Sequence, residues 1–371
     1  MIAFVIGTKA ELIKCAPVML ELQKNKTPYF FVHTGQHPLG KSCEEFGIKK
    51  PDYFLSEETK EGKQLGSKAG ISSWLWFLKI IFKVRGLLRN INPDYVIYHG
   101  DTISTGAAAI GSSSILNPFK KWKNVHLEAG LRSGSFLEPF PEEIVRQTAD
   151  RFSDILLAVS QLSAKNLKRE RATGVFGKIF IVGNTVLDSA EITYSKVKKQ
   201  DNQKKQSKEE YALINMHRHE NLGSLDRMQK IIEIIKSINI RSIWPMHEVT
   251  KEAFESYGLM RELKKIKKLE ITAPVSHKEF ILLLINSKYL IVDGGSIQEE
   301  SLIFKKPCIL LRKTTERPEG LSTGINFLTK LNVAYTKKVM RDIEENRIKV
   351  KDFKNPYGEV GVSKKILELL K

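Results

Sequence analysis

Short apolar runs alternate with amphipathic stretches along the whole chain. The runs at 2–6, 29–33 and 211–215 are apolar throughout, which is typical of strands that are buried on both faces of a parallel sheet. Further strands are predicted at 95–98, 125–127, 155–159, 179–182, 242–245, 269–273, 289–292 and 308–311. Helical patterns lie between them, among others at 11–24, 75–88, 277–285 and 297–304. This alternation predicts doubly wound parallel sheets with helices on both faces.

The length of 371 residues suits two domains, each with a core of its own. Between 195 and 208 the sequence is SKVKKQDNQKKQSK, which is polar, charged and without apolar periodicity. We expect an interdomain linker or a long surface loop there. The predicted fold is α/β, with two doubly wound Rossmann-like domains. The N-terminal domain covers 1–187 and is completed by a C-terminal helix at 359–371, and the second domain covers 188–358.

The chain is strongly basic, with 60 Lys and Arg against 42 Asp and Glu and a net charge of +18. Its basic runs hold too few aromatic residues for base stacking, and no zinc-finger or RNP motif occurs, so we expect no nucleic-acid partner. We interpret most of the excess as solvated helix faces and a linker. Attraction of a phosphate-bearing ligand and a weak association with a membrane surface are the alternatives.

No segment has the length and apolarity of a membrane span. The nearest, 71–88, is interrupted by Lys79, Lys83 and Arg85; it could lie on a membrane, but a strand follows closely, which favours a core helix. Met1 leads directly into an apolar strand, unlike a signal peptide, and the three cysteines form no CxxC pair. We therefore expect a cytoplasmic protein with neither disulfides nor a thiolate zinc site.

Candidate acid/base groups follow strands in the first half, where ligands bind in open α/β sheets. Asp101 follows the strand at 95–98, and Glu128 follows the strand at 125–127. Glu142 opens a predicted helix, with Arg146 four residues later on the same face. Removing a proton from a sugar carbon needs a carboxylate base, and departure of a leaving group benefits from an acid or a cation.

The second half offers a candidate phosphate site. The sequence DGGS at 293–296 follows an apolar strand and opens a helix, so backbone N–H groups and the helix dipole favour an anion there. Glu300, one turn later, is placed to accept hydrogen bonds from ribose hydroxyls. His217 and His247 follow other strands; without an assigned third ligand or an HExxH motif, we expect no metal and interpret them as donors to a diphosphate.

Seven segments in fixed order carry a more specific resemblance: HGDT (99–102), HLEAGLRS (126–133), PFPEEIVRQ (139–147), GNT (183–185), HRHEN (217–221), GGSIQEE (294–300) and TTERPEG (314–320). Together they resemble the non-hydrolysing UDP-N-acetylglucosamine 2-epimerases over residues 2–324. The resemblance implies a GT-B-type fold, with UDP bound mainly by the second domain in an interdomain cleft. It also implies interconversion of UDP-GlcNAc and UDP-ManNAc without metal or redox cofactor, by elimination of UDP to a 2-acetamidoglucal and re-addition, for cell-surface polysaccharide synthesis.

The resemblance also implies roles for individual residues. Asp101, Glu128 and Glu142 would be the acid/base carboxylates, Arg146 would position Glu142 and the sugar, and His217 would stabilise the departing diphosphate. The UDP-binding residues would be Lys9, Lys14, His247, Gly294, Gly295, Ser296, Glu300 and Arg317.

Some positions depart from the family pattern. GTKAE at 7–11 replaces GTRPE, so that Lys9 stands where the family has Arg, and GGS at 294–296 permutes SGG. The residues at 38–41, PLGK, replace polar ones that hold a second, activating UDP-GlcNAc in the family. These departures leave the exact sugar and the regulation open.

Three alternatives to a 2-epimerase that retains UDP remain. They are a GT-B glycosyltransferase that uses a UDP-sugar, a hydrolysing epimerase that releases ManNAc, and a basic protein for membrane or RNA that has kept the fold without the chemistry. For each enzyme the partner is a UDP-sugar. We expect a homodimer, because two-fold dimers are the commonest closed assembly.

Overall fold

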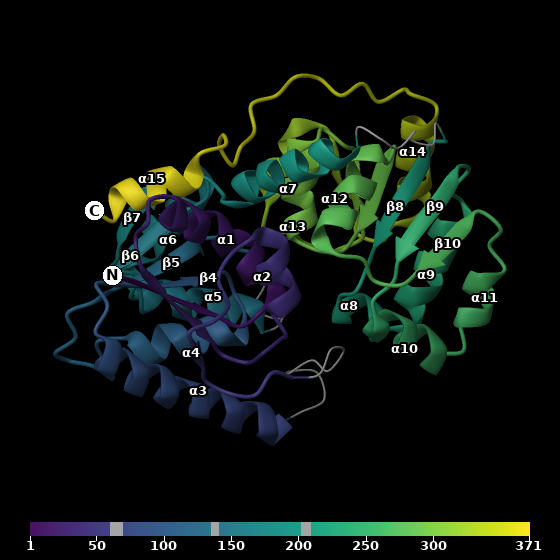
Figure 1. The fold of residues 1–371 in the computed structure, drawn as a ribbon. Coiled ribbons are helices and arrows are strands. Elements are labelled where there is room, and N and C mark those ends of the chain that lie inside the picture. Colours follow the sequence, from purple (N-terminus) through teal and green to yellow (C-terminus); the bar gives the residue numbers. More distant parts are fainter. Residues whose placement is uncertain (60–69, 135–140, 202–208) are drawn as a thin grey trace. The chain divides into compact units, whose positions relative to one another are not determined.

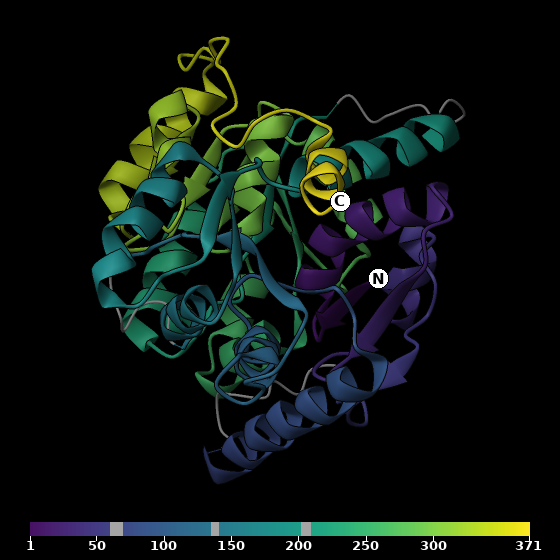
Figure 2. The same cartoon turned by 90° about the vertical axis from the view of Figure 1, so that its left-hand side faces the viewer.

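The computed structural model describes residues 1–59, 70–134, 141–201 and 209–371. They form two compact units, Met1–Ser189 with Tyr357–Lys371, and Ala190–Pro356. In each unit, helices cover both faces of a parallel sheet, as Figures 1 and 2 show. The predicted class, α/β with two doubly wound Rossmann-like sheets, is confirmed.

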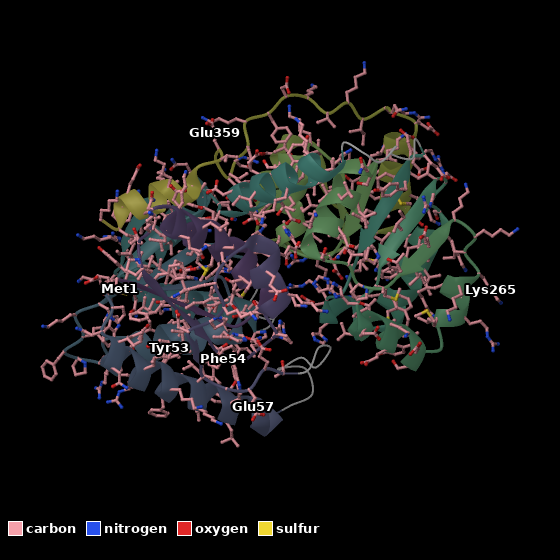
Figure 3. The ribbon with its side chains drawn as sticks, viewed as in Figure 1. Met1, Tyr53, Phe54, Glu57, Lys265 and Glu359 are labelled. Carbon is pink, nitrogen blue, oxygen red and sulfur yellow. The ribbon has the colours of Figure 1, made fainter. Side chains whose placement is uncertain are left out.

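The first unit is built on a seven-stranded sheet in the order β3-β2-β1-β4-β5-β6-β7. Its strands are β1 (Ile2–Ile6), β2 (Tyr29–His33), β3 (Tyr53–Phe54), β4 (Tyr95–His99), β5 (Lys123–Ala129), β6 (Ile155–Ala158) and β7 (Lys178–Ile181). From β1 to β3 the chain adds strands on one side of the sheet, and from β4 to β7 it adds them on the other side. The loops after β1 and β4 therefore flank the topological switch point. The sequence did not predict the edge strand β3, whose Tyr53 and Phe54 are labelled in Figure 3.

The helices of the first unit are α1 (Lys9–Lys24), α2 (Gly40–Phe46), α3 (Gly70–Ile91), α4 (Ile103–Ser112), α5 (Glu142–Arg151), α6 (Gln161–Arg169), η1 (Glu170–Thr173) and α15 (Val362–Leu369). The C-terminal α15 packs on α1. Asp188 ties it to the unit by accepting hydrogen bonds from the backbone N–H groups of Gly361 and Ser363 at 2.6 and 2.7 Å. The end of the chain thus completes the first unit.

The second unit has a six-stranded sheet in the order β10-β9-β8-β11-β12-β13. Its strands are β8 (Tyr211–Asn215), β9 (Arg241–Pro245), β10 (Leu269–Thr272), β11 (Tyr289–Val292), β12 (Cys308–Leu310) and β13 (Asn326–Leu328). Its helices are α8 (His219–Leu222), α9 (Leu225–Lys236), α10 (Glu248–Ser256), α11 (Met260–Lys264), α12 (His277–Asn286), α13 (Ser296–Ile303), η2 (Pro318–Thr323) and α14 (Val333–Glu344). The switch point lies between β8 and β11.

The prediction of a linker or surface loop at 195–208 is wrong for residues 195–201, which are helical. Helix α7 (Val186–Asp201) runs from the first unit into the second and includes residues 195–201, whereas 202–208 lie outside the described residues. Ala190 and Val197 are buried, and Tyr194 packs its ring at 5.9 Å from that of Phe304. These few contacts stabilise the helix, and the Lys and Gln side chains of the segment are compatible with it. Its polar composition had indicated a loop.

The stretch 71–88 forms the longer helix α3, and it is only half a core helix. Ile80, Val84 and Leu88 are buried in a cluster with residues of β1, β4 and α4. The opposite face exposes Trp74 and Phe82, which are 63% and 60% accessible. Among the described residues, no helix is long and apolar enough to cross a membrane.

Candidate active site

Glu128 lies on a bulge at the carboxyl end of β5. The register between β5 and β6 shifts between Leu127 and Ala129, and Glu128 has a φ of 72°. A bulge redirects a side chain, and the left-handed conformation costs a residue with a Cβ about 1 kcal/mol or more, which the surrounding structure must offset. The local backbone therefore fixes the direction of this carboxylate at the edge where ligands bind.

Two buried donors hold the Glu128 carboxylate. Lys14, which is 1% exposed, forms an ion pair through Nζ with Glu128 Oε2. Asn184 Nδ2 donates to the same oxygen at 2.9 Å, and its own Oδ1 accepts from the Val186 N–H at 2.9 Å. His99 Nε2 lies 3.7 Å from Glu128 Oε2, beyond hydrogen-bond distance. An ammonium in direct contact favours the ionised form of Glu128, the form that a general base requires.

Asp101 lies beside this bulge. His99 pairs with Leu127 in the register of β4 and β5, and the Gly100 N–H donates to the Leu127 carbonyl at 3.0 Å. Asp101 keeps 31% of its side chain exposed while it pairs with Nη2 of the buried Arg146. The two predicted carboxylates thus occupy neighbouring loops, and one of them is accessible to a ligand.

Arg146 has a second carboxylate partner that sequence reasoning missed. Its Nη1 donates to Glu143 Oε2 at 2.5 Å, and Ser133 N–H donates to the same oxygen at 3.1 Å. Glu142, expected to pair with Arg146, is the first residue of α5 and is partly exposed; residues 135–140 before it lie outside the described chain. The helix spacing is i,i+3 for Glu143 and i,i+4 for Glu142, and both spacings bring side chains to one face.

A network of buried hydrogen bonds lies next to the pair of Asp101 and Arg146. His126 places Nδ1 at 2.7 Å from Asp150 Oδ1 and Nε2 at 2.8 Å from the carbonyl oxygen of Gly100, next to Asp101. Arg132 Nη2 donates to Asp150 Oδ2 at 2.7 Å. Burial opposes ionisation of Asp150, but Arg132 and His126 outweigh it and bring its pKa below the usual 3.8. Asp150 is therefore a fixed anion that organises the loop carrying Asp101.

The GTKAE segment shapes the adjacent loop. Glu11 accepts hydrogen bonds from the Gly7 and Thr8 N–H groups at 2.8 and 2.7 Å, in a capping box at the start of α1. Its other oxygen accepts from the hydroxyl of Thr102 at 2.7 Å. Glu11 therefore joins the turns after β1 and β4, while Lys9 lies in the first turn of α1, only partly buried.

In the second unit, Asp293 organises the loop that carries His217. Its carboxylate accepts from the backbone N–H groups of His217 and Arg218 at 3.0 and 3.1 Å, and from Asn221 Nδ2 at 3.0 Å. Burial lowers the pKa of His217 below 6.5, against the opposing effect of Asp293. His217 is therefore a neutral imidazole near pH 7, which can exchange a proton with a bound group.

At the start of α13, where the sequence predicts a phosphate site, two glycines allow other side chains to approach the backbone closely. A Cβ on Gly295 would lie 2.6 Å from Arg317 Nη1 and 2.6 Å from Glu316 Oε1, and one on Gly294 would lie 3.5 Å from His217 Cε1. Arg317 is buried, with Nε 2.9 Å from Glu299 Oε1. The two glycines thus bring Arg317 and His217 close to the backbone where α13 begins, at Ser296.

The remaining predicted residues of this unit border the same edge of the sheet. The rings of His217 and His247 lie 5.2 Å apart, edge to face. Glu300 is buried and its Oε1 lies 3.1 Å from Nε2 of His277, a residue that the sequence analysis did not single out. The structure therefore places His217, His247, the two glycines, Arg317 and Glu300 on α13 or near its start, and Asp101, Glu128, Arg146 and Lys14 near the carboxyl ends of β4 and β5.

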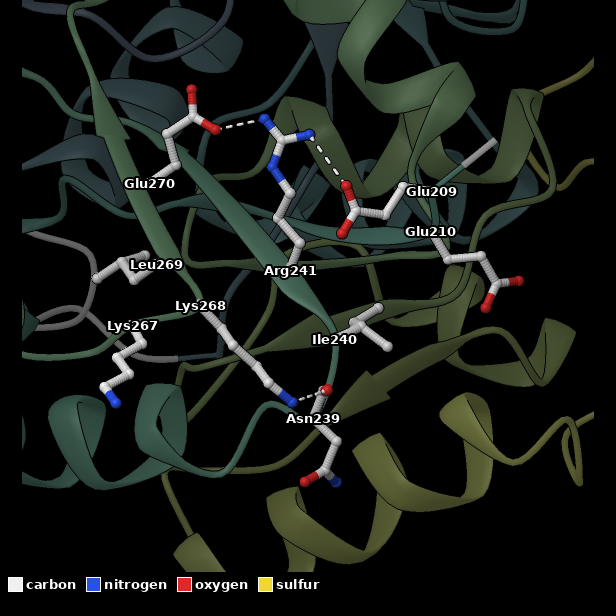
Figure 4. Close-up of a pocket in the computed structure, with 9 residues that line it drawn as sticks. All are labelled: Glu209, Glu210, Asn239, Ile240, Arg241, Lys267, Lys268, Leu269 and Glu270. Atoms are coloured by element: carbon white, nitrogen blue, oxygen red, sulfur yellow. Dashed lines mark hydrogen bonds and ion pairs between the residues drawn. The ribbon is translucent and has the colours of Figure 1, made fainter. Parts of the chain in front are cut away.

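A cavity of about 650 Å³ occurs elsewhere, at the amino ends of β8, β9 and β10. Figure 4 shows Arg241 between Glu209 and Glu270, with Lys268 donating to Asn239. This end of a parallel sheet lies opposite the ligand-binding edge. Within the described residues, no three side chains of the His, Cys, Asp and Glu types converge as a metal site would require.

The chain is similar to known proteins over its whole length. The family model described as UDP-N-acetylglucosamine 2-epimerase matches residues 20–371. A Methanocaldococcus jannaschii protein named UDP-N-acetylglucosamine 2-epimerase is 31% identical, over 100% of this chain and 98% of its own. A Pseudomonas aeruginosa protein named UDP-2,3-diacetamido-2,3-dideoxy-D-glucuronate 2-epimerase is 32% identical, over 87% of this chain and 86% of its own. The crystal structure of the Methanocaldococcus jannaschii UDP-GlcNAc 2-epimerase in complex with UDP-GlcNAc and UDP matches with a TM-score of 0.83 and 32% identity, over 100% and 99% of the two chains.

Proposed function

Because the chain belongs to the UDP-N-acetylglucosamine 2-epimerase family, whose GT-B-type fold it shares, we propose that it interconverts UDP-GlcNAc and UDP-ManNAc, or a close pair of UDP-HexNAc sugars, without releasing the sugar. The observation that carries this proposal is the Glu128 site. A carboxylate on a strained bulge, paired with a buried lysine and placed beside the accessible Asp101, suits proton transfer at carbon.

The proposed reaction proceeds through elimination. A carboxylate of the first unit removes the proton from C2 while the bond between C1 and the diphosphate oxygen breaks, and the electron pair of the C2–H bond forms the C1–C2 double bond of a 2-acetamidoglucal. UDP departs with the electrons of the C1–O bond. A second carboxylic acid returns a proton to the opposite face of C2, and UDP adds back to C1. Asp101, Glu128 and Glu142 supply these proton transfers.

We assign stabilisation of the leaving group to the second unit. The N-terminus of α13, with Gly294, Gly295 and Ser296, together with Arg317, offers N–H donors and a positive charge to the diphosphate. His217, neutral and next to Gly294, donates to a diphosphate oxygen as negative charge grows there. In addition, Lys9 and His247 bind the diphosphate and Glu300 binds the ribose in this proposal.

The proposal extends to the cellular location and the assembly state of the protein. We propose that the protein acts in the cytoplasm, where its three cysteines, all free and buried, remain reduced, and that its product enters cell-surface polysaccharide. We also propose a homodimer and a weak association with membrane.

Proton exchange at C2 tests the proposal. Purified protein is incubated with UDP-GlcNAc in deuterated water and followed by proton NMR; deuterium at C2 together with UDP-ManNAc is the expected result. Glu128→Gln should abolish exchange and retain UDP binding, because the amide keeps the shape but cannot accept the proton. Glu255→Gln, an exposed change on α10, is the matched control and should exchange normally.

Each other outcome contradicts the proposal in a different way. Release of free ManNAc would show a hydrolysing epimerase, and UDP binding without exchange would favour a transferase. Exchange with a UDP-2,3-diacetamido uronate but not with UDP-GlcNAc would move the substrate to that class. Loss of UDP affinity in Glu128→Gln, as large as the loss of rate, would make Glu128 a binding or folding residue.

A further inference from the structure

His277 contacts Glu300, the residue proposed to bind the ribose. His277 is the first residue of α12, and Glu300 lies in α13, five residues after Gly295. His277 Nε2 lies 3.1 Å from Glu300 Oε1, and the two side chains are 12% and 5% exposed. An ionised carboxylate only accepts hydrogen bonds, so Nε2 of His277 carries the proton of this pair. His277 is therefore a donor that holds one of the two oxygens of Glu300.

The position of His277 is set by the start of α12. The Ser276 hydroxyl accepts from the Glu279 N–H at 3.2 Å, and the Ser276 N–H donates to Glu279 Oε2 at 2.9 Å. This capping box fixes where the helix begins. Phe280 follows His277 by three residues on the same face and is buried in one cluster with Ile297 of α13. The cap and the cluster together place the imidazole of His277 against α13.

Glu300 differs from the two other buried carboxylates near the start of α13. Arg317 Nε lies 2.9 Å from Glu299 Oε1, and Arg312 Nη2 lies 3.0 Å from Glu316 Oε2. Among the described residues, no Lys or Arg pairs with Glu300, and none donates a hydrogen bond to its Oε2. A buried carboxylate needs donors to offset its lost hydration. The remaining acceptor capacity of Glu300 therefore suits hydroxyl groups of a ligand.

We propose that His277 is a positioning residue through which Glu300 selects a ribonucleotide over its 2′-deoxy counterpart. This inference rests on the proposed binding of UDP and adds the residue that decides nucleotide specificity. Because His277 holds Oε1, Oε2 is left to accept from the adjacent 2′- and 3′-hydroxyls of the ribose. A nucleotide without the 2′-hydroxyl leaves this buried acceptor short of a donor, which costs more affinity than the loss of a contact in water.

Calorimetric titration with UDP and with 2′-deoxy-UDP tests the proposal. The wild-type chain should bind UDP about 10–100-fold more tightly, the effect expected for one hydrogen bond to a charged acceptor. In His277→Phe, which keeps a ring and loses the donor, this ratio should fall by about tenfold, whereas His277→Gln retains an N–H donor and should keep most of it. With UDP-GlcNAc as substrate, His277→Phe should raise KM and leave kcat nearly unchanged, because the ribose is remote from C2.

A double-mutant cycle separates positioning from a structural role. If His277 acts through Glu300, His277→Phe/Glu300→Gln should have the same ratio of affinities as Glu300→Gln alone. Asn286→Ala is the matched control. Asn286 ends the same helix, its Nδ2 donates to the Leu282 carbonyl at 3.0 Å within α12, and its replacement should leave the ratio unchanged. Thermal unfolding of all variants confirms that they fold.

The proposal is overturned if the wild-type chain binds both nucleotides equally, if His277→Phe keeps the wild-type ratio, or if Asn286→Ala lowers the ratio as much as His277→Phe. A double variant with a lower ratio than Glu300→Gln would also overturn it, because His277 would then act independently of Glu300. Exchange at C2 in deuterated water reports separately on the proposed epimerase. A chain that exchanges C2 while His277→Phe keeps the wild-type ratio contradicts the role of His277 alone, and a chain that binds neither nucleotide contradicts both proposals.

Discussion

Replacing Lys14 separates two roles that this residue could have. The family resemblance assigns it to the diphosphate, whereas in the structure its ammonium contacts the Glu128 carboxylate in the interior of the first unit. Lys14→Met keeps the length of the side chain and removes the charge. Asn184 then remains as the hydrogen-bond donor to Glu128 at 2.9 Å, and His99 remains 3.7 Å away.

The size of the effect follows from this geometry. An opposite charge in direct contact moves the titration of a carboxyl group by about 1–3 pH units. The acid limb of kcat should therefore move to higher pH by about that amount in Lys14→Met, and the rate on the limb should fall about tenfold per unit. Lys14→Arg, which retains a cation, should move it less. Breaking a buried pair costs about 3–5 kcal/mol if the remaining charge persists, and protonation of Glu128 limits that cost.

Protonation also fixes the sign of the stability change. In Lys14→Met the folded state favours the neutral acid, so the variant should lose stability relative to the wild-type chain as pH rises above the ordinary range of a glutamate. The assays are kcat against pH, urea unfolding at several pH values, and calorimetric titration with UDP. Lys14→Met/Glu128→Gln should recover much of the lost stability, since it leaves no buried charge at this site. If the acid limb of kcat does not move and the affinity for UDP falls at least tenfold, the reasoning is refuted. Lys14 would then be a residue that binds the diphosphate.

Three further perturbations test other parts of the site. His217→Asn should lower the rate of C2 exchange by about 10²–10³-fold, because it removes a donor to the departing diphosphate; a rate near that of the wild-type chain would remove His217 from the reaction. Gly295→Ala places a methyl group 2.6 Å from Arg317 Nη1 and should weaken UDP binding by about tenfold or more in calorimetry, and unchanged affinity would contradict the proposed phosphate site. Asp150 has a pKa below 3.8 in the folded state, so it stabilises the fold above the ordinary range of an aspartate and loses this effect as pH falls through the folded value. Unfolding midpoints of Asp150→Asn should therefore depend less on pH below about 4 than those of the wild-type chain, and equal slopes would exclude this role.

The strands were the most predictable part of the fold. Buried parallel strands must be apolar on both faces, and the patterns at 211–215 and 289–292 coincide with β8 and β11. The errors have separate physical causes. Strand β3 has two residues and no periodicity that could reveal it, and α7 continues through a polar segment on the strength of a few buried contacts. The outward face of α3 has the apolarity of a core, so the sequence favoured a core helix over the alternative of a helix that lies on a surface.

At the candidate site, the residues proposed to meet a ligand were easier to single out than the residues that hold them. Asp101, Glu128 and His217 follow strands, and a general rule of open α/β sheets directs attention to such places. Their supporting partners come from far along the chain: Lys14 is 114 positions from Glu128, and Asn184 is 56. No local pattern relates positions so distant, but one local signal was present. Lys14 lies among the buried residues Leu12, Cys15 and Ala16 of α1, and a lysine among buried apolar neighbours needs a buried anion to compensate its desolvation. A charge within an apolar helix stripe therefore predicts that an anionic partner exists, although only the fold shows that the partner is Glu128.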